Sequence, residues 1–348
     1  MRQVSISRRT FTTSAGLALA CLAAPGLRAQ TRLEKAKIAI AVGGKAAFYA
    51  LPLTIADQLD FFKAEGLDVT ITDFAGGAQA LQSVLEGGAD VVSGAFEHTI
   101  ELQSRNQFFQ AFVLQGRAPQ IALGVSRKTM PGYKVMADLR GKKIGVSAPG
   151  SSTNMVATQV LWRAGIKSNE VTFVGVGTGA TALAALRSGQ IDVLSSADPV
   201  MTILEQKSEV RVIADTRTLK GTIDVFGGAM PAGCLYAPTA FLEKNPNTAQ
   251  AMANAIVHAL KWLQTAGPGD IIKTVPEAYL LGDRGLYLAS FEKVREAIAL
   301  DGVFPEDGAR VALKALASFE PTVKADKIDL AKTFTNEFSR KAKARFKA

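Results

Sequence analysis

The chain repeats one order of elements twice, and this repeat limits the folds that it can adopt. In each half, a strand-like run ends in a Gly-rich turn, a helical segment follows, and Gly-x-x-Asp-Val leads into another apolar run. The first copy ends in Leu85-Glu-Gly-Gly-Ala-Asp-Val-Val92 and the second in Leu186-Arg-Ser-Gly-Gln-Ile-Asp-Val-Leu194. Alternating strands and helices are typical of parallel α/β sheets. The repeat therefore predicts two similar Rossmann-like lobes rather than one large sheet.

The predicted elements divide the chain into two lobes that are joined by two crossings. Lobe 1 is expected to comprise residues 36–125 and 232–348, including a helix-rich tail, and lobe 2 residues 127–226. The crossings near Val125–Arg127 and Phe226–Pro231 would act as hinges. Strands are expected at 37–42, 67–73, 89–93, 108–114, 120–125, 143–147, 171–175, 191–195 and 232–236, and the tail helices at 246–265, 271–281, 286–300 and 307–318.

The first 29 residues read as an export signal. Ser7-Arg-Arg-Thr-Phe11 resembles the twin-arginine motif, and the apolar run Ala15–Ala24 precedes a small-residue cleavage pattern that ends at Ala29. That run is too short for a membrane-spanning helix, which needs roughly 20 apolar residues. Thr12 is atypical for the motif, so ordinary secretion stays an alternative, as does a lipid anchor on Cys21. The predicted location is the periplasm.

Charge and cysteine content narrow the possible functions. Without residues 1–29, which hold four arginines and no acids, the formal charge falls from +9 to +5. There is no basic stripe with interleaved aromatic residues, so a nucleic-acid partner is not expected. Only Cys234 then remains, which excludes an intrachain disulfide; its apolar neighbours predict a buried structural thiol. We expect a monomer.

The segment Gly141–Thr153 is the strongest candidate for a binding element. The strand-like run Lys143–Ser147 is broken by Ala148-Pro-Gly150, and Ser151, Ser152 and Thr153 then precede an apolar helical pattern. Such a helix start offers free backbone N–H groups, a positive dipole end and hydroxyl donors. It predicts a site for an anion or a polar head group, although an ordinary capped helix start has the same pattern.

Catalytic and cofactor motifs are missing from the sequence. With only His98 and His258, a multi-histidine metal site is excluded, and no metal or cofactor is expected. Gly175-Val-Gly-Thr-Gly179 lacks the spacing of a dinucleotide fingerprint, and neither a P-loop lysine nor a Gly-x-Ser-x-Gly elbow is present.

Several segments in order resemble one known family. They are Leu53–Val69, Gly87–Val92, Leu139–Val146, Ala180–Val193 and Phe241–Pro246. The chain resembles type II periplasmic solute-binding proteins of the nitrate/sulfonate/taurine-binding group, which are receptors for ABC importers. The resemblance implies two hinged lobes that close on a small organic solute and a permease as partner.

The resemblance also implies where the ligand binds, since ligands of such sheets lie beyond the carboxyl ends of the strands. The expected contacts from lobe 1 are Lys45, Tyr49, Gly76, Gly77, Glu97 and His98, and those from lobe 2 are Ser147, Ser151, Ser152, Thr153, Thr178 and Asp198, with Arg117 just before the first crossing. Arg117 would hold a carboxylate or sulfonate by a bidentate pair. As an unpaired carboxylate, Asp198 would instead suit an amine or ring N–H. Structural roles stay open as alternatives for Lys45, Tyr49, His98, Arg117 and Asp198.

The sequence leaves the ligand undetermined. Sulfonates, aromatic carboxylates and pyrimidine-type thiamine precursors all suit Ser/Thr donors beside Arg117, Glu97 and the aromatic residues Phe48, Tyr49 and Phe96. Two other functions stay open. The same family includes thiamine-pyrimidine synthases, which rely on a cysteine-rich segment that is missing here, and a receptor of this kind could instead signal to a membrane kinase.

Overall fold

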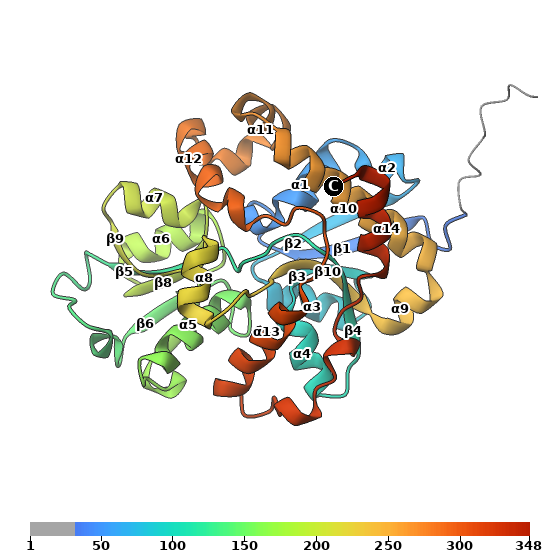
Figure 1. Ribbon diagram of the computed structural model, residues 1–348. Coiled ribbons are helices and arrows are strands. Elements are labelled where there is room, and N and C mark those ends of the chain that lie inside the picture. Colours follow the sequence, from blue (N-terminus) through green and yellow to red (C-terminus); the bar gives the residue numbers. More distant parts are fainter. Residues whose placement is uncertain (1–31) are drawn as a thin grey trace, which may run out of the picture. The chain divides into compact units, whose positions relative to one another are not determined.

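The structure is a computed structural model that describes residues 32–348 (Figure 1). The predicted export signal, including Cys21 and the cleavage pattern at Ala29, lies outside the described residues. The strands are β1 (Lys37–Gly43), β2 (Asp68–Phe74), β3 (Val91–Ala95), β4 (Phe109–Leu114), β5 (Ile121–Ser126), β6 (Lys143–Val146), β7 (Thr172–Gly175), β8 (Val193–Ala197), β9 (Val210–Asp215) and β10 (Gly233–Pro238). The helices are η1 (Phe48–Ala50), α1 (Leu51–Gln58), α2 (Phe61–Ala64), α3 (Gly77–Leu85), α4 (Glu97–Ser104), η2 (Met136–Leu139), α5 (Ser152–Arg163), η3 (Ser168–Glu170), α6 (Ala180–Ser188), α7 (Val200–Gln206), α8 (Leu219–Phe226), α9 (Thr239–Lys244), α10 (Pro246–Thr265), α11 (Pro268–Thr274), η4 (Glu277–Leu280), α12 (Arg284–Val294), η5 (Arg295–Ala297), α13 (Glu306–Phe319), η6 (Ala325–Lys327), η7 (Leu330–Lys332) and α14 (Glu337–Phe346).

The two sheets have the same arrangement, as the sequence repeat predicts. The strand order is β2-β1-β3-β10-β4 in the first sheet and β7-β6-β8-β5-β9 in the second. In each, three strands run parallel, and the fourth position is taken by an antiparallel strand that follows a crossing. The α/β fold with two lobes is thereby confirmed.

One strand belongs to a different sheet from the one predicted. The run at 120–125 was expected to close lobe 1, but it forms β5, which pairs with β8 and β9 in the second sheet. The chain therefore crosses at about Gln115–Gln120, before the predicted hinge at Val125–Arg127. Every residue of β5 is buried, and a continuous apolar run does not indicate which sheet it joins.

Breaks in the helical tail follow local sequence signals. The predicted helix at 271–281 is divided into α11 and η4 because Pro276 cannot continue an α-helix. The predicted helix at 286–300 ends earlier, since α12 passes into η5 and Ile298 then forms a bridge to Gly116. By contrast, α10 has the bounds that its apolar spacing predicts, with Pro246 at its first position.

Helix α12 contacts elements of both lobes. On one side, the rings of Tyr287 and Phe291 pack against Phe48 of η1, with centroids 4.6 and 6.2 Å apart. On the other, Leu286 belongs to the apolar cluster that α6 and α7 form on the second sheet. In Figure 1, α12 lies above α7, whereas α10 and α14 lie side by side against the first sheet.

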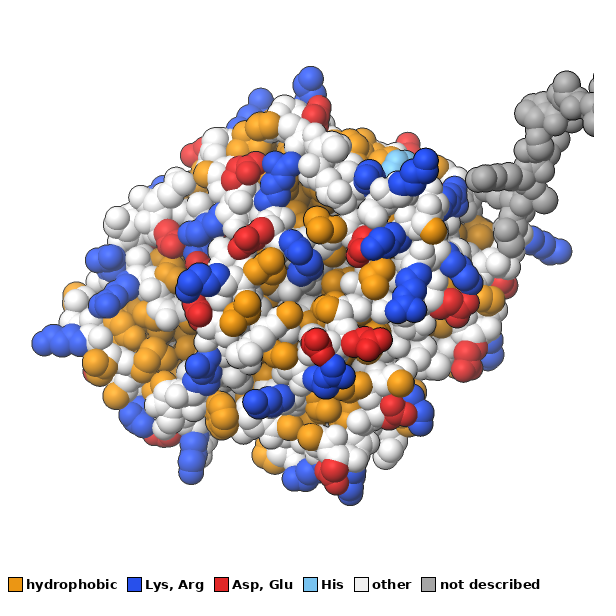
Figure 2. All heavy atoms as spheres, viewed as in Figure 1, with side chains coloured by type: hydrophobic (Ala, Val, Ile, Leu, Met, Phe, Trp, Pro, Cys, Tyr) orange, Lys and Arg blue, Asp and Glu red, His pale blue; other side chains and the backbone are white. Residues whose placement is uncertain are grey.

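Residues 32–348 contain no helix that is both long and apolar enough to cross a bilayer. On the face shown in Figure 2, acidic and basic side chains are interspersed, with no stripe of a single sign.

Candidate functional site

The carboxyl ends of the central strands of the two sheets enclose a cavity, which we call the cleft. Its volume is ≈ 70 Å³. It is lined by Gly43, Ala46, Ala47, Tyr49, Gly77, Gly94, Ala95, Pro119, Ala232 and Gly233 from the first-sheet side or the crossings, by Ile121, Ser147, Ser151, Ser152, Thr153, Thr178, Gly179, Ser196, Ala197, Asp198, Pro199 and Val200 from the second, and by Tyr279 and Leu281 from the tail. The predicted position beyond the strand ends agrees with this cavity.

The start of α5 is directed at the facing lobe, as its sequence suggests. Ser151 is the N-cap residue, yet its hydroxyl makes no capping bond within α5. Instead, the Ser151 Oγ accepts a hydrogen bond of 2.9 Å from the backbone N–H of Ala78 in α3. The first N–H groups of α5, at Ser152 and Thr153, have no acceptor among the described residues. They are therefore available to an anion or another acceptor in the cleft.

The other hydroxyls of this segment already have protein partners. Thr153 Oγ1 accepts the N–H of Ser147 at 2.9 Å and also bonds the Ser147 hydroxyl at 2.9 Å. From the neighbouring strand, the Ser195 hydroxyl donates to the Thr153 carbonyl at 2.7 Å. These bonds fix the shape of the turn between β6 and α5. Among Ser147, Ser151, Ser152 and Thr153, the hydroxyl of Ser152 is thus the one with no bond to another described residue.

Four hydroxyls of the cleft make no hydrogen bond to any described residue. They belong to Tyr49, Ser152, Thr178 and Tyr279, all of which line the cavity. Burial, followed by the charge of Asp73, raises the pKa of Tyr279 to about 12 and raises that of Tyr49 further. Both phenols are therefore neutral O–H donors near neutral pH. Together with the free N–H groups of α5, they give the cleft donors that carry no charge.

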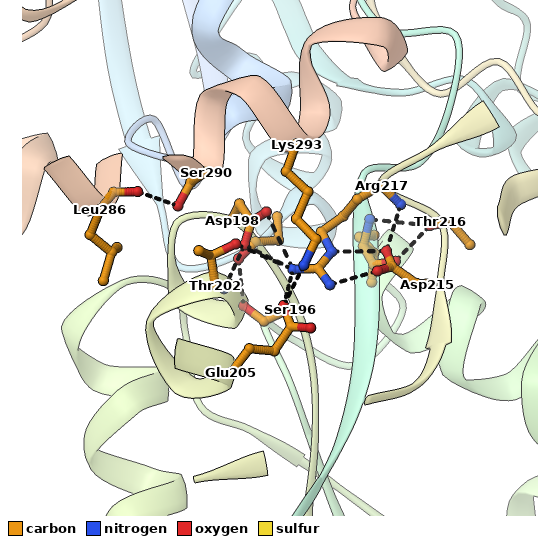
Figure 3. Close-up of polar contacts among 12 residues, drawn as sticks. Ser196, Asp198, Thr202, Glu205, Asp215, Thr216, Arg217, Leu286, Ser290 and Lys293 are labelled. Carbon is orange, nitrogen blue, oxygen red and sulfur yellow. Dashed lines mark hydrogen bonds and ion pairs between the residues drawn. The ribbon is translucent and has the colours of Figure 1, made fainter. Parts of the chain in front are cut away.

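Among the described residues that line the cavity, Asp198 is the only Asp, Glu, Lys, Arg or His, and its carboxylate is turned into a buried ion cluster (Figure 3). The Arg217 Nη1 lies 3.3 and 3.4 Å from its two oxygens, and the Thr202 N–H donates to Oδ1 at 2.8 Å. The side chains of Asp198 and Arg217 are both fully buried. The predicted unpaired carboxylate is therefore wrong, and Asp198 offers no charge to a ligand.

Arg217 holds two further acids in the same cluster. Its Nη2 lies 2.6 Å from Asp215 and its Nη1 lies 2.7 Å from Glu205, which also pairs with Lys293 of α12 at 2.8 Å. Burial opposes ionisation of Glu205 and Asp215, but hydrogen bonds from Arg217 outweigh it and lower the pKa of both. For Asp198, deeper burial prevails and raises the pKa. Arg217 is distant in sequence from the strand end that it stabilises, and no local motif marks it.

Glu97 and His98 lie behind the wall of the cleft rather than in it. Glu97 is buried, and neither of its carboxylate oxygens has a hydrogen-bond partner among the described residues. His98 bonds the Tyr236 hydroxyl through Nδ1 at 2.9 Å and the Gly150 carbonyl through Nε2 at 3.3 Å. Because a carbonyl only accepts, Nε2 carries the proton in this arrangement and Nδ1 accepts from Tyr236. His98 thus joins the two lobes but does not line the cavity.

Three other predicted contacts also lie outside the cavity. Lys45 pairs with Asp57 at 3.3 Å. Gly76 lies where the lobes touch, and a Cβ added there would be 2.9 Å from the Ser151 hydroxyl. Arg117 donates to the Glu296 carbonyl at 2.5 Å and lines a separate pocket. Position before or after a strand end does not determine the direction of a long side chain.

The aromatic residues of the cleft differ from those expected. Phe48 packs on Tyr287, and Phe96 packs on Phe304 at 5.4 Å, so both are core residues. Of the predicted aromatic set, Tyr49 lines the cavity. The sequence does not predict Tyr279, because it lies 46 positions after Gly233, the lining residue that precedes it, and only the packing of the tail brings it to the cavity.

The described residues include no group of three or more His, Cys, Asp or Glu side chains placed to hold a metal ion. Cys234 is a free, buried thiol, as its apolar neighbours predict. Burial, with a smaller contribution from the charge of Glu97, raises the pKa of this thiol well above its ordinary value. Cys234 is therefore unsuited to act as a nucleophile.

Known proteins similar to this chain share its fold. A protein of Bordetella bronchiseptica RB50 with a solved structure is 60% identical and covers 91% of this chain and 100% of its own, with a TM-score of 0.90. The alkanesulfonate-binding protein SsuA of Xanthomonas axonopodis pv. citri, bound to MOPS, is 18% identical, with coverages of 88% and 100% and a TM-score of 0.69. The periplasmic nitrate-binding protein NrtA of Synechocystis is 15% identical, with coverages of 90% and 89% and a TM-score of 0.64.

The sequence comparisons agree with this resemblance. The Bacillus subtilis protein YtlA, named as a binding protein, is 24% identical over 270 residues, which cover 75% of this chain and 76% of YtlA. The family model described as "NMT1/THI5 like" matches residues 47–266, which is more than half of the sequence. The chain therefore belongs to the NMT1/THI5-like family.

Proposed function

We propose that this protein is a periplasmic receptor that binds a small anionic or zwitterionic organic solute in the cleft and delivers it to an ABC permease. One observation carries the proposal: unpaired N–H and O–H donors from Tyr49, Ser152, Thr153, Thr178 and Tyr279 surround an enclosed cavity between two lobes. The structural neighbours include sulfonate- and nitrate-binding proteins, and this similarity supports the same function.

The N–H and O–H donors of the cleft favour a ligand whose negative charge is bound by neutral groups rather than by a cationic side chain. No Lys, Arg or His lines the cleft, and the Asp198 carboxylate is occupied by Arg217. A carboxylate or sulfonate group would be bound by the N–H groups at the start of α5 and by neighbouring hydroxyls. The remaining lining, which includes Ala47, Ile121 and Leu281, suits an apolar part of the ligand.

A thermal-shift screen tests this function. The compounds are alkanesulfonates, aromatic carboxylates, nitrate and pyrimidine-type thiamine precursors, and we expect at least one class to raise the melting temperature. Calorimetry then measures its affinity for the wild type and for Ser152→Ala. The free hydroxyl of Ser152 can bond a charged group of the ligand. Loss of that bond in Ser152→Ala should cost about 1.5–3 kcal/mol of binding free energy. Thr153 is a poorer probe, since its hydroxyl supports the turn.

The screen also separates the alternatives. If none of these classes binds, the receptor function fails. If a thiamine precursor is chemically converted, the protein is an enzyme, although the buried Cys234 and the lack of a nucleophile–base pair in the cleft lining favour binding alone. A receptor that activates a membrane kinase would bind the same ligand, but deletion of its gene would leave uptake of that ligand unchanged, whereas deletion of an importer receptor would abolish uptake.

A further inference from the structure

A second pocket lies outside the cleft, beside the first crossing. Its volume is ≈ 410 Å³, within the range of about 300–1,000 Å³ that small-molecule sites occupy. It is lined by Arg117 on the crossing, Leu260, Leu263 and Gln264 of α10, Glu292 of α12, Arg295 and Glu296 of η5, and Ile298, Ala299 and Leu300 after it.

Arg117 is the cation of this pocket that has no acidic partner. Its one hydrogen bond from the side chain goes to the Glu296 carbonyl, and no carboxylate of residues 32–348 lies within ion-pair distance. The two acids in the wall are engaged elsewhere: Glu292 pairs with Arg295 at 3.2 Å, and the Glu296 carboxylate accepts the N–H of Leu219 at 2.9 Å. A guanidinium has five N–H donors, so most of those of Arg117 are free.

The rest of the wall is mainly apolar. Leu260, Leu263 and Ile298 are buried, whereas Leu300 is 50% exposed and is one of the few large apolar side chains on the surface. Leu300 therefore continues the apolar lining from the buried wall to the solvent-exposed edge of the pocket. Free cationic donors beside an apolar wall suit a ligand that has an anionic head and an apolar tail.

The wall of this pocket is already held in place by backbone hydrogen bonds. The N–H of Arg117 donates to the Ala297 carbonyl at 2.7 Å, Gly116 forms a bridge with Ile298, and the N–H of Ala299 donates to Gln115 at 2.9 Å. The crossing and the segment after η5 therefore form a fixed wall. A preformed site spends less binding free energy on ordering.

We propose that this pocket binds an amphipathic carboxylate, with the carboxylate on Arg117 and an alkyl or aryl tail on Leu260, Leu263 and Leu300. Arg117 would take the carboxylate by two parallel N–H···O bonds, the geometry in which guanidinium and carboxylate match best. This site is separate from the solute cleft and goes beyond the receptor function.

Sodium octanoate is the probe that tests the proposal, with octan-1-ol as the neutral compound of the same tail. Calorimetry on the purified protein should show saturable binding of octanoate, and weaker binding of octanol. Arg117→Gln should reduce octanoate affinity by about tenfold or more, since it removes a charge-assisted pair. Leu300→Asp should do the same by repelling the carboxylate. Because Leu300 is exposed, this variant should keep the melting temperature of the wild type.

The controls distinguish this pocket from the cleft and from general charge effects. Arg127→Gln removes another arginine that donates to a backbone carbonyl and has no acidic partner among residues 32–348, and it should leave octanoate binding unchanged. Ser152→Ala should also leave it unchanged. The proposal is overturned if octanoate does not bind, if Arg117→Gln binds as tightly as the wild type, or if Ser152→Ala alone abolishes binding. Failure of the solute screen would not change any of these results.

Discussion

At the scale of single residues, Arg217 supports one wall of the cleft. Its guanidinium is fully buried and contacts three acids, two of which are separated from it by more than ten positions in the sequence. Asp198, the partner nearest the cavity, directly precedes Pro199 and Val200, which also line it. A buried ion pair adds little stability by itself, but removal of one partner leaves a charge buried without compensation.

We therefore expect Arg217→Met to destabilise the protein strongly. The free energy of unfolding should fall by about 3–5 kcal/mol, because Asp198 keeps a buried carboxylate without its cation. Urea unfolding followed by circular dichroism measures the change. The matched control is Arg187→Met, which breaks a partly exposed pair with Glu209 and should cost at most about 1 kcal/mol. Equal losses in the two variants would contradict the role of Arg217.

His258 is the second residue with a specific consequence. Its ring stacks between Phe61 at 3.8 Å and Phe346 at 4.7 Å, and so connects α10 with α2 and α14. Burial, assisted by the charge of Arg345, lowers the pKa of His258 below its ordinary value of 6.5. The neutral ring is thus the form that suits the folded protein.

This lowered pKa predicts a loss of stability in acid. As the pH falls below about 6.5, the unfolded chain takes up a proton at this position before the folded chain does, and the free energy of unfolding decreases. Above that pH, His258 makes its full contribution to the free energy of unfolding. Melting temperatures at about pH 7.5 and about pH 5.5 should differ less in His258→Phe, which keeps a stacked ring but does not titrate. An equal difference in wild type and variant would contradict the assignment.

The sequence identified residues of the site where the backbone decides the position. Ser152 and Thr153 could be predicted because the first turn of a helix fixes where their N–H groups point, and they line the cleft. The direction of the Glu97 and Arg117 side chains could not be predicted, since a long side chain beside a strand end can turn to either side. The pairing of Asp198 with Arg217 depends on tertiary packing alone, so no spacing in the sequence indicates it.

At the scale of elements, α12 is the helix that ties the second lobe to the tail. Tyr287 packs on Phe48 of η1, and Lys293 reaches Glu205 of α7 at 2.8 Å. Figure 3 shows Lys293 extending from α12 toward the ion cluster of the second lobe. Glu205 keeps its bond to Arg217 when Lys293 is removed, so a change at Lys293 tests the contact between elements rather than the buried cluster.

We expect Lys293→Met to weaken closure of the lobes without unfolding either of them. The pair is about one-third exposed on each side, and a pair of this kind contributes about 0.5–1 kcal/mol. Affinity for the solute found by screening should therefore fall by about two- to fivefold. Calorimetry measures it, and Lys293→Arg, which retains the charge, should bind nearly as the wild type does. Unchanged affinity in Lys293→Met would exclude this contact from closure.

Elements were easier to predict than their assignment to sheets. The strand–helix order and the bounds of α10 follow from apolar periodicity, which depends only on residues that are close in sequence. The sheet that β5 joins does not follow from periodicity, because its six residues would be buried in either lobe. Pairing between strands that are far apart in sequence is decided by the packing of the whole fold.

At the scale of the whole molecule, a closed cleft brings the two lobes into contact. Gly76 lies at that contact, and its extended backbone has no need of glycine. An added Cβ would lie 2.9 Å from Ala148 and from the Ser151 hydroxyl, and 3.0 Å from the Ser147 hydroxyl, all in the facing lobe. Glycine at this position therefore allows the approach of the two lobes.

We expect Gly76→Val to hold the lobes apart while each lobe remains folded. The radius of gyration from small-angle X-ray scattering should increase relative to the wild type, and solute affinity should fall by about tenfold or more. Gly132→Val is the control, since no atom lies within 4 Å of a Cβ added there. A Gly76→Val protein with the scattering curve and affinity of the wild type would show that closure does not bring the lobes together at this point.

The most direct test of the central claim is a crystal structure determined with the compound that the screen selects. We expect difference density for that compound between the two sheets, with an acceptor group at hydrogen-bond distance from the N–H groups of Ser152 and Thr153. We also expect the compound to contact at least one of the Tyr49, Thr178 and Tyr279 hydroxyls. Density for the compound only at another place on the protein would contradict the account.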